Sequence, residues 1–106
     1  MEESTLTISL IYIDRLCENT KIQMTMNNIH RLIITSILLA IKYNEDDYYS
    51  NSHYAKVGGI SLQELNTLED EFIEGLNWKV FVDLDLFEKY DIYLKHYQGL
   101  VKNSIK

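Results

Sequence analysis

The chain has 106 residues, 46% of them hydrophobic and 25% charged, so it has room for one globular domain and is too apolar to be wholly disordered. Its formal net charge of -6 disfavours binding to nucleic acid and to anionic membrane surfaces, because both need a basic protein face. Cys17 is the single cysteine, and the acidic start Glu2-Glu3 has the wrong sign for a targeting peptide. We therefore expect a soluble intracellular protein, nuclear or cytoplasmic, without an intramolecular disulfide.

The first half of the chain predicts two helices. No proline interrupts the sequence. A first helix is predicted over about 6–18, where apolar residues recur at the spacing of one helical face. They are Leu6, Leu10, Ile13 and Cys17. A second helix is predicted over about 28–43, and its run 32–41 is apolar nearly all round. We expect an all-α bundle around this central helix.

The second half predicts a long connection and two further helices. Residues 44–60 are long for an unstructured loop, so we expect helical turns around 51–56. Ser61 and Glu64 form a capping box, in which each side chain is expected to bind the other residue's backbone amide. The helix that follows is expected to end near 77 or 78. A last helix, capped by Asp83 or Asp85, is predicted to reach about residue 98.

No pattern in the sequence indicates catalysis. The three histidines, His30, His53 and His96, are dispersed and lack metal-ligand spacing. The acidic run 45–47 lacks the alternation and glycine of a calcium loop. Cys17 lies on an apolar stripe and is interpreted as a small core residue. We expect no enzymatic activity, no cofactor and no metal.

Several charged residues occur where the apolar periodicity predicts core. Asp14 interrupts the first helix, Lys42 closes the second, and Glu69 lies between Leu68 and Phe72. From spacing alone, Lys42 is favourable at a helix C-terminus, and Glu69 is compatible with a solvated acidic face. Asp14 is compatible with an ion pair to a nearby arginine.

Separated motifs resemble the cyclin box, and the later ones resemble the P-type (U-type) cyclins in particular. Tyr12-Ile13-Asp14-Arg15-Leu16, His30-Arg31-Leu32-Ile33-Ile34-Thr35-Ser36 and Ala40-Ile41-Lys42-Tyr43 are similar to the second and third helices of the box. Tyr54-Ala55-Lys56-Val57-Gly58-Gly59-Ile60-Ser61-Leu62-Gln63-Glu64-Leu65-Asn66 resembles the P-type signature, and Leu68-Glu69-Asp70-Glu71-Phe72 and Leu76-Asn77-Trp78 continue it. The resemblance covers roughly residues 5–98.

The resemblance implies a regulatory subunit that binds and activates a cyclin-dependent protein kinase, in cell-cycle control or nutrient signalling. By motif position, Lys42 and Glu69 are the residues that contact the kinase, at the positive and negative ends of an apolar groove that receives its regulatory helix. The residues that correspond to the groove lining are Leu39, Tyr43, Ile73, Trp78 and Val80. Two other interpretations remain: a cyclin-fold adaptor, as in transcription, and a small helical metalloenzyme.

The resemblance also implies that the first helix of the box is missing and that residues 1–106 form a single, partial cyclin-box domain, with 99–106 as a frayed tail. In the family, that helix supplies an arginine for the residue matching Asp14. Asp14 is therefore expected to pair with Arg15 or Arg31, or to stay solvated. The apolar face left uncovered is expected to be covered by a second copy, by helix exchange or by the kinase.

Overall fold

The computed structural model describes residues 2–105, with side chains over 2–102, and this part of the chain is helical without strands. The helices are α1 (Glu3–Thr20), α2 (Ile29–Asn44), α3 (Asn51–Gly58), α4 (Leu62–Gly75) and α5 (Leu84–Ile105). They confirm the expected all-α fold, including the helical turns in the connection before the double glycine.

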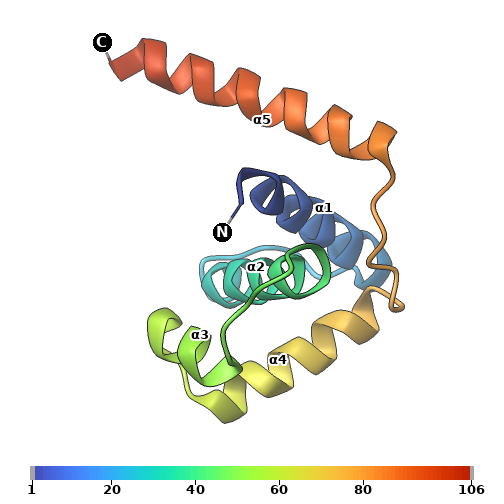
Figure 1. Cartoon of the computed structure of the whole chain (residues 1–106), viewed down its shortest axis with the longest axis vertical. Helices are drawn as coiled ribbons and strands as arrows, with labels where there is room; N and C mark the ends of the chain where they lie inside the picture. Colours follow the sequence, from blue (N-terminus) through green and yellow to red (C-terminus); the bar gives the residue numbers. More distant parts are fainter. Residues whose placement is uncertain (1, 106) are drawn as a thin grey trace.

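The helices form successive layers, with α5 over α1, α1 against α2, and α4 with the short α3 on the far side of α2 (Figure 1). The main core lies where α1, α2 and α4 meet, and apolar side chains from all three helices fill it. The core side chains are Ile8, Tyr12, Ile13, Leu16, Leu39, Ala40, Phe72, Ile73 and Leu76. α1 thus shares the centre of the bundle with α2, whose Ile29 and Ile33 are exposed on the surface.

Local capping signals set several helix boundaries. The Ser61 hydroxyl accepts a hydrogen bond from the Glu64 amide at 3.0 Å, and Asp83 accepts one from the Leu86 amide at 2.8 Å. Both confirm the predicted caps. The other half of the capping box is wrong, because the Glu64 side chain turns away to Arg31 and does not reach back to Ser61.

The segment between α4 and α5 is fixed against α1. The Arg15 guanidinium donates hydrogen bonds to the carbonyls of Lys79 and Phe81, at 2.9 and 2.8 Å. The Tyr12 hydroxyl, on a buried ring, donates to the carbonyl of Val80 at 2.7 Å. Since these bonds tie the connection to the first helix, they set where α5 begins.

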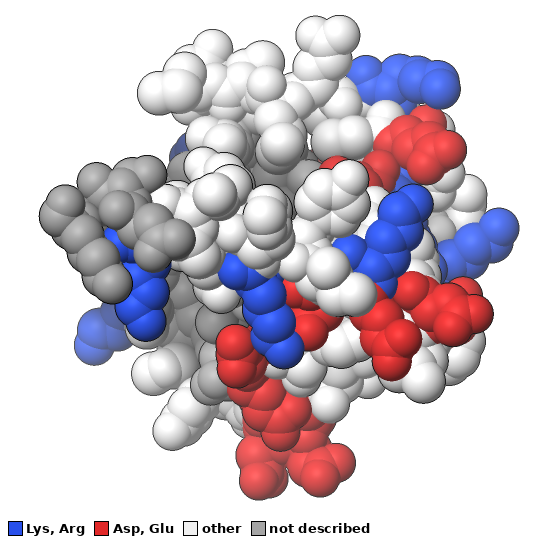
Figure 2. Space-filling view, turned by 90° about the horizontal axis from the view of Figure 1, so that it is seen from above, with Lys and Arg blue, Asp and Glu red and all other residues white. Residues whose placement is uncertain are grey.

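α5 packs on α1, the helix predicted to carry an uncovered apolar face. The Thr7 hydroxyl on α1 donates to Asp91 on α5 at 3.1 Å, and the Tyr90 hydroxyl on α5 donates to Asp14 on α1 at 2.7 Å. α5 continues through Ile105, beyond the end predicted near residue 98, and residue 106 lies outside the described part. Figure 2 views the molecule from the α5 side, where uncharged side chains occupy much of the surface.

Candidate functional site

The two charged residues singled out from the sequence meet in space. Lys42 lies in the last turn of α2 and Glu69 lies in the middle of α4. The Lys42 ammonium donates to Glu69 Oε2 at 2.7 Å, and the two side chains are only 23% and 18% exposed. The pair therefore links two helices in a partly desolvated position, where an ionic contact is stronger than on an open surface.

A third helix joins this pair. The Asn51 side-chain amide, at the start of α3, donates to Glu69 Oε1 at 3.0 Å and to Asn66 Oδ1 at 2.8 Å. Both oxygens of Glu69 are thus occupied by donors from different helices. We did not predict Asn51 or Asn66, although the spacing of Asn66 three residues before Glu69 places both on one face of α4.

The structure differs in two ways from the apolar groove that the resemblance implies. Lys42 and Glu69 bond to each other and do not stand apart at its two ends. Leu39 and Ile73, expected to line it, are 1% and 4% exposed and belong to the core. The reason is that α2 is packed between α1 and α4, and Leu39 lies in the core where side chains of all three helices meet.

The remaining expected partner-binding residues are accessible to different degrees. Tyr43 follows Lys42 and is about half exposed, while Val80 is partly buried against the core. Trp78 is 65% exposed and has a φ of 60°, directly after Asn77 at 54°. Left-handed backbone is costly for residues with a side chain. The chain therefore leaves α4 through two left-handed residues, of which Asn77 tolerates this conformation and Trp78, a large exposed aromatic residue, does not.

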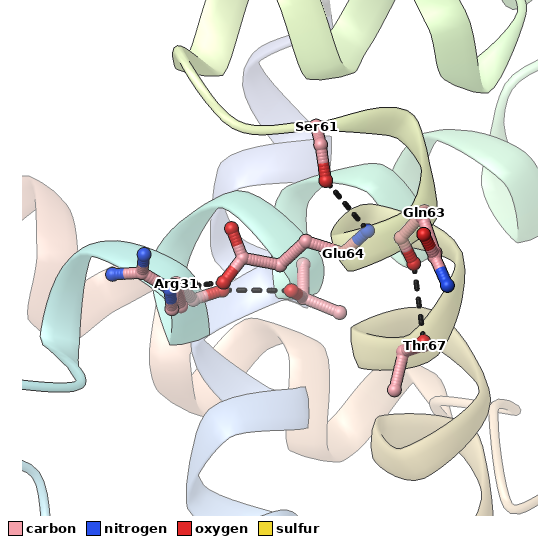
Figure 3. A network of polar contacts seen from close by, with 6 residues as sticks. Arg31, Ser61, Gln63, Glu64 and Thr67 are labelled. Carbon is pink, nitrogen blue, oxygen red and sulfur yellow. Dashed lines mark hydrogen bonds and ion pairs between the residues drawn. The ribbon is translucent and has the colours of Figure 1, made fainter.

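A second ion pair joins the same two helices near the start of each. The Arg31 Nε donates to Glu64 Oε2 at 2.8 Å, beside the Ser61 cap (Figure 3). Both side chains are more exposed than those of the Lys42–Glu69 pair, and the Glu64 carboxylate raises the pKa of Arg31. This pair serves as an internal comparison for the partly buried one.

Asp14 is paired with neither Arg15 nor Arg31 in the described part of the chain, and its side chain is exposed, as in the alternative that it stays solvated. Arg15 binds backbone carbonyls and Arg31 binds Glu64, whereas Asp14 accepts from the Tyr90 hydroxyl. The hydrogen bond to Asp14, followed by partial burial, raises the pKa of Tyr90 to about 12. Asp14 accepts from a neutral donor because α5 packs on α1 and places the Tyr90 hydroxyl next to the Asp14 carboxylate.

Two further observations concern the described residues. No group of three or more His, Cys, Asp or Glu side chains within that part of the chain is arranged to hold a metal ion. None of the described helices has both the length and the apolar character needed to cross a bilayer.

Comparisons with known proteins agree with the motifs. The Cyclin family model matches residues 1–80. Cyclin-U2-1 of Arabidopsis thaliana is 42% identical over 93 residues, covering 87% of this chain and 42% of the relative. Cyclin-P3-1 of Oryza sativa subsp. japonica is 38% identical over 92 residues, covering 87% and 39%.

A yeast protein is also similar. PHO85 cyclin-7 of Saccharomyces cerevisiae is 42% identical over 93 residues, covering 76% of this chain and 33% of the relative. The chain thus spans less than half the length of each of these three relatives. The family model, the U-type and P-type relatives and the all-helical fold lead to one conclusion: this chain belongs to the cyclin family.

Proposed function

We propose that this chain is a regulatory subunit that binds a cyclin-dependent protein kinase and holds the kinase's regulatory helix in its active position. The observation that carries the proposal is the partly buried Lys42–Glu69 pair, held by Asn51 and followed along α2 by the exposed Tyr43. Family membership supports a cyclin's regulatory role, and one relative is named as a PHO85 cyclin.

The pair has bonding capacity left for a partner. An ammonium has three donors, and Lys42 gives one to Glu69. A carboxylate has about four acceptor positions, and Glu69 uses one on each oxygen. Lys42 can therefore donate to a backbone carbonyl and Glu69 can accept from a backbone amide of the kinase, while their mutual bond keeps both side chains in place.

The exposed aromatic residues supply apolar contact. Aromatic anchors contribute much of the binding energy at protein interfaces, and Trp78 and Tyr43 already project to the surface. Moving a kinase from 1% to 99% active requires about 5.5 kcal/mol of differential binding. An ordinary interface of about 1,600 Å² supplies that when a few anchors fit well.

The test compares two ion pairs that join the same helices. Lys42→Ala and Glu69→Ala are each expected to weaken binding to a cyclin-dependent kinase by about 1 to 3 kcal/mol, since each removes a partly buried charged contact. Arg31→Ala breaks the other pair between α2 and α4 and is expected to leave binding unchanged. Binding is measured by calorimetry with purified kinase subunits of the source cell, and circular dichroism checks the helix content.

Two results would contradict the proposal. Equal kinase binding by the wild type, Lys42→Ala and Glu69→Ala would show that this ion pair is not part of the kinase-binding site. Kinase binding without an increase in phosphorylation of a model substrate would exclude activation and favour an adaptor with the cyclin fold.

A further inference from the structure

A second site lies at the loop between α2 and α3. A cavity of about 380 Å³ is lined there by Ile41 and by aromatic and acidic side chains, which are Tyr48, Tyr49, His53, Tyr54, Glu45 and Asp47. Its volume lies within the range of small-molecule sites. Neither lysine nor arginine is among the residues that line it, so the charge facing the cavity is negative.

The rings form walls that stand nearly at right angles. The Tyr49 and His53 centroids are 4.4 Å apart with planes tilted by 34°, so these two rings make one wall. Tyr54 meets them edge-on, at 69° to Tyr49 and 78° to His53. Tyr49 is 67% exposed, so much of its side chain is accessible to a ligand in the cavity. A corner of ring faces surrounds a compact, tetrahedral cation better than it stacks on a planar one.

The corner is held in place by the fold. The Tyr54 hydroxyl accepts a hydrogen bond from the Tyr49 amide at 3.1 Å, which closes the loop onto α3. Glu45 Oε2 accepts from the Thr5 hydroxyl at 2.6 Å and from the Glu2 amide at 3.1 Å, which ties the loop to the start of α1. The Thr5 hydrogen bond is the main cause that lowers the pKa of Glu45, so this carboxylate stays ionised beside the rings.

We propose that this cavity binds a methylated ammonium group, either on a lysine side chain or as a free quaternary amine. Ring faces attract such a cation through their quadrupole, and its methyl groups make apolar contact with the same faces. Glu45 and Asp47 add direct charge attraction. The inference requires no kinase, so it stands apart from the proposed function.

The test titrates four probes into the whole chain and follows the amide signals of residues 45–54 by NMR. The probes are choline, blocked trimethyllysine, blocked lysine and the neutral tert-butyl isostere of trimethyllysine, in which carbon replaces the charged nitrogen. We expect one or both methylated cations to bind, and the tighter of the two identifies the source. Lysine is expected to bind more weakly because its ammonium is more strongly hydrated, and the neutral isostere at least about tenfold more weakly.

Variants assign the effect to the cavity. Tyr49→Leu and Asp47→Asn are each expected to weaken binding of the methylated cation by about tenfold, whereas Tyr49→Phe keeps the ring face and the affinity. Tyr97→Leu on α5 is the matched control, because Tyr97 is 66% exposed, much like Tyr49. The proposal fails if no methylated cation binds, if lysine or the neutral isostere binds as tightly, or if Tyr49→Leu behaves like Tyr97→Leu.

Discussion

The backbone conformation of Trp78 is unfavourable, and its side chain, which is mostly exposed, recovers little of that free energy by packing. The left-handed backbone at this residue costs about 1 to 2 kcal/mol relative to the right-handed region, and the side chain is mostly in solvent. Strained residues of this kind persist where the surrounding structure fixes them, and they gather at functional positions. The strained backbone and the exposed ring support the proposed role of Trp78 in kinase binding.

Replacing Trp78 separates its effect on the stability of the fold from its effect on kinase binding. In Trp78→Gly the strain is relieved, while the unfolded chain gains freedom, so the free energy of unfolding is expected to stay within about 1 kcal/mol of the wild type. Kinase binding is expected to weaken at least about tenfold, because an aromatic anchor is lost. Urea denaturation and kinase titration give the two quantities.

The neighbouring residue provides the control. Asn77→Gly makes the same kind of backbone change and leaves Trp78 intact, so kinase binding is expected to be unchanged. If Trp78→Gly binds the kinase as the wild type does, Trp78 is not part of the interface.

At the scale of elements, a single glycine controls how closely α4 approaches α1. A Cβ built at Gly75 would collide with the Leu16 side chain of α1 and lie 3.1 Å from the Thr20 methyl group. Leu16 is buried in the core and cannot move away without displacing other side chains. The absence of a side chain at Gly75 therefore lets the last turn of α4 lie close to α1.

Two glycine substitutions are expected to have opposite effects. Gly75→Ala should lower the free energy of unfolding by about 1 to 3 kcal/mol, because overpacking outweighs the gain in helix propensity. Gly99→Ala on α5 should raise it by up to about 1 kcal/mol, since nothing lies within 4 Å of the added carbon. Urea denaturation measures both, and a stable Gly75→Ala protein would show that α4 has room to move.

At the scale of the whole molecule, polar bonds to α1 help to hold α5 in place. Asp91 joins the two helices through Thr7 and is also paired with Lys95, which lowers the pKa of Asp91. Tyr90 joins them through Asp14, while Phe87 packs against the core. Apolar residues of α5 are also exposed, and they include Leu84, Ile92, Tyr93, Tyr97 and Leu100. The attachment of α5 to the bundle thus combines two side-chain hydrogen bonds to α1 with the packing of Phe87.

The Tyr90–Asp14 bond predicts a loss of stability at alkaline pH. The folded protein holds the Tyr90 proton more tightly than the unfolded chain, because the pKa is raised from 10.0 to about 12. The stabilisation is complete below pH 10 and is lost as the pH rises through 12. Because Tyr90 is largely solvent-screened, we expect the loss to be about 1 kcal/mol.

Removing the hydroxyl tests this bond. Tyr90→Phe should be less stable than the wild type at pH 8, and the difference between the two should shrink towards pH 12. Tyr12 also has a raised pKa, mainly from burial, and its contribution cancels in the comparison. A difference that stays constant from pH 8 to 12 would show that the phenol proton does not contribute.

Local features of the sequence were enough to predict the helices and the caps at Ser61 and Asp83, but not the direction of the Glu64 side chain. Ser61 and Asp83 bind amides three residues ahead, and the apolar periods of α1 and α4 are readable within a few turns. The motifs that surround Lys42 and Glu69 also indicated the family, which the family model and the relatives confirmed. These features depend on neighbours along the chain, so the amino-acid order by itself determines them.

Only the tertiary structure decided which side chains meet across helices. Lys42 and Glu69 lie 27 residues apart, and their contact depends on how α4 crosses α2. The packing of the helices also brings Asn51 into contact with Glu69 and buries Leu39 in the core. Asp14 received a phenol in place of an arginine because α5 packs over α1. Periodicity gives the face on which a side chain lies, but the packing of whole helices sets what that face encounters.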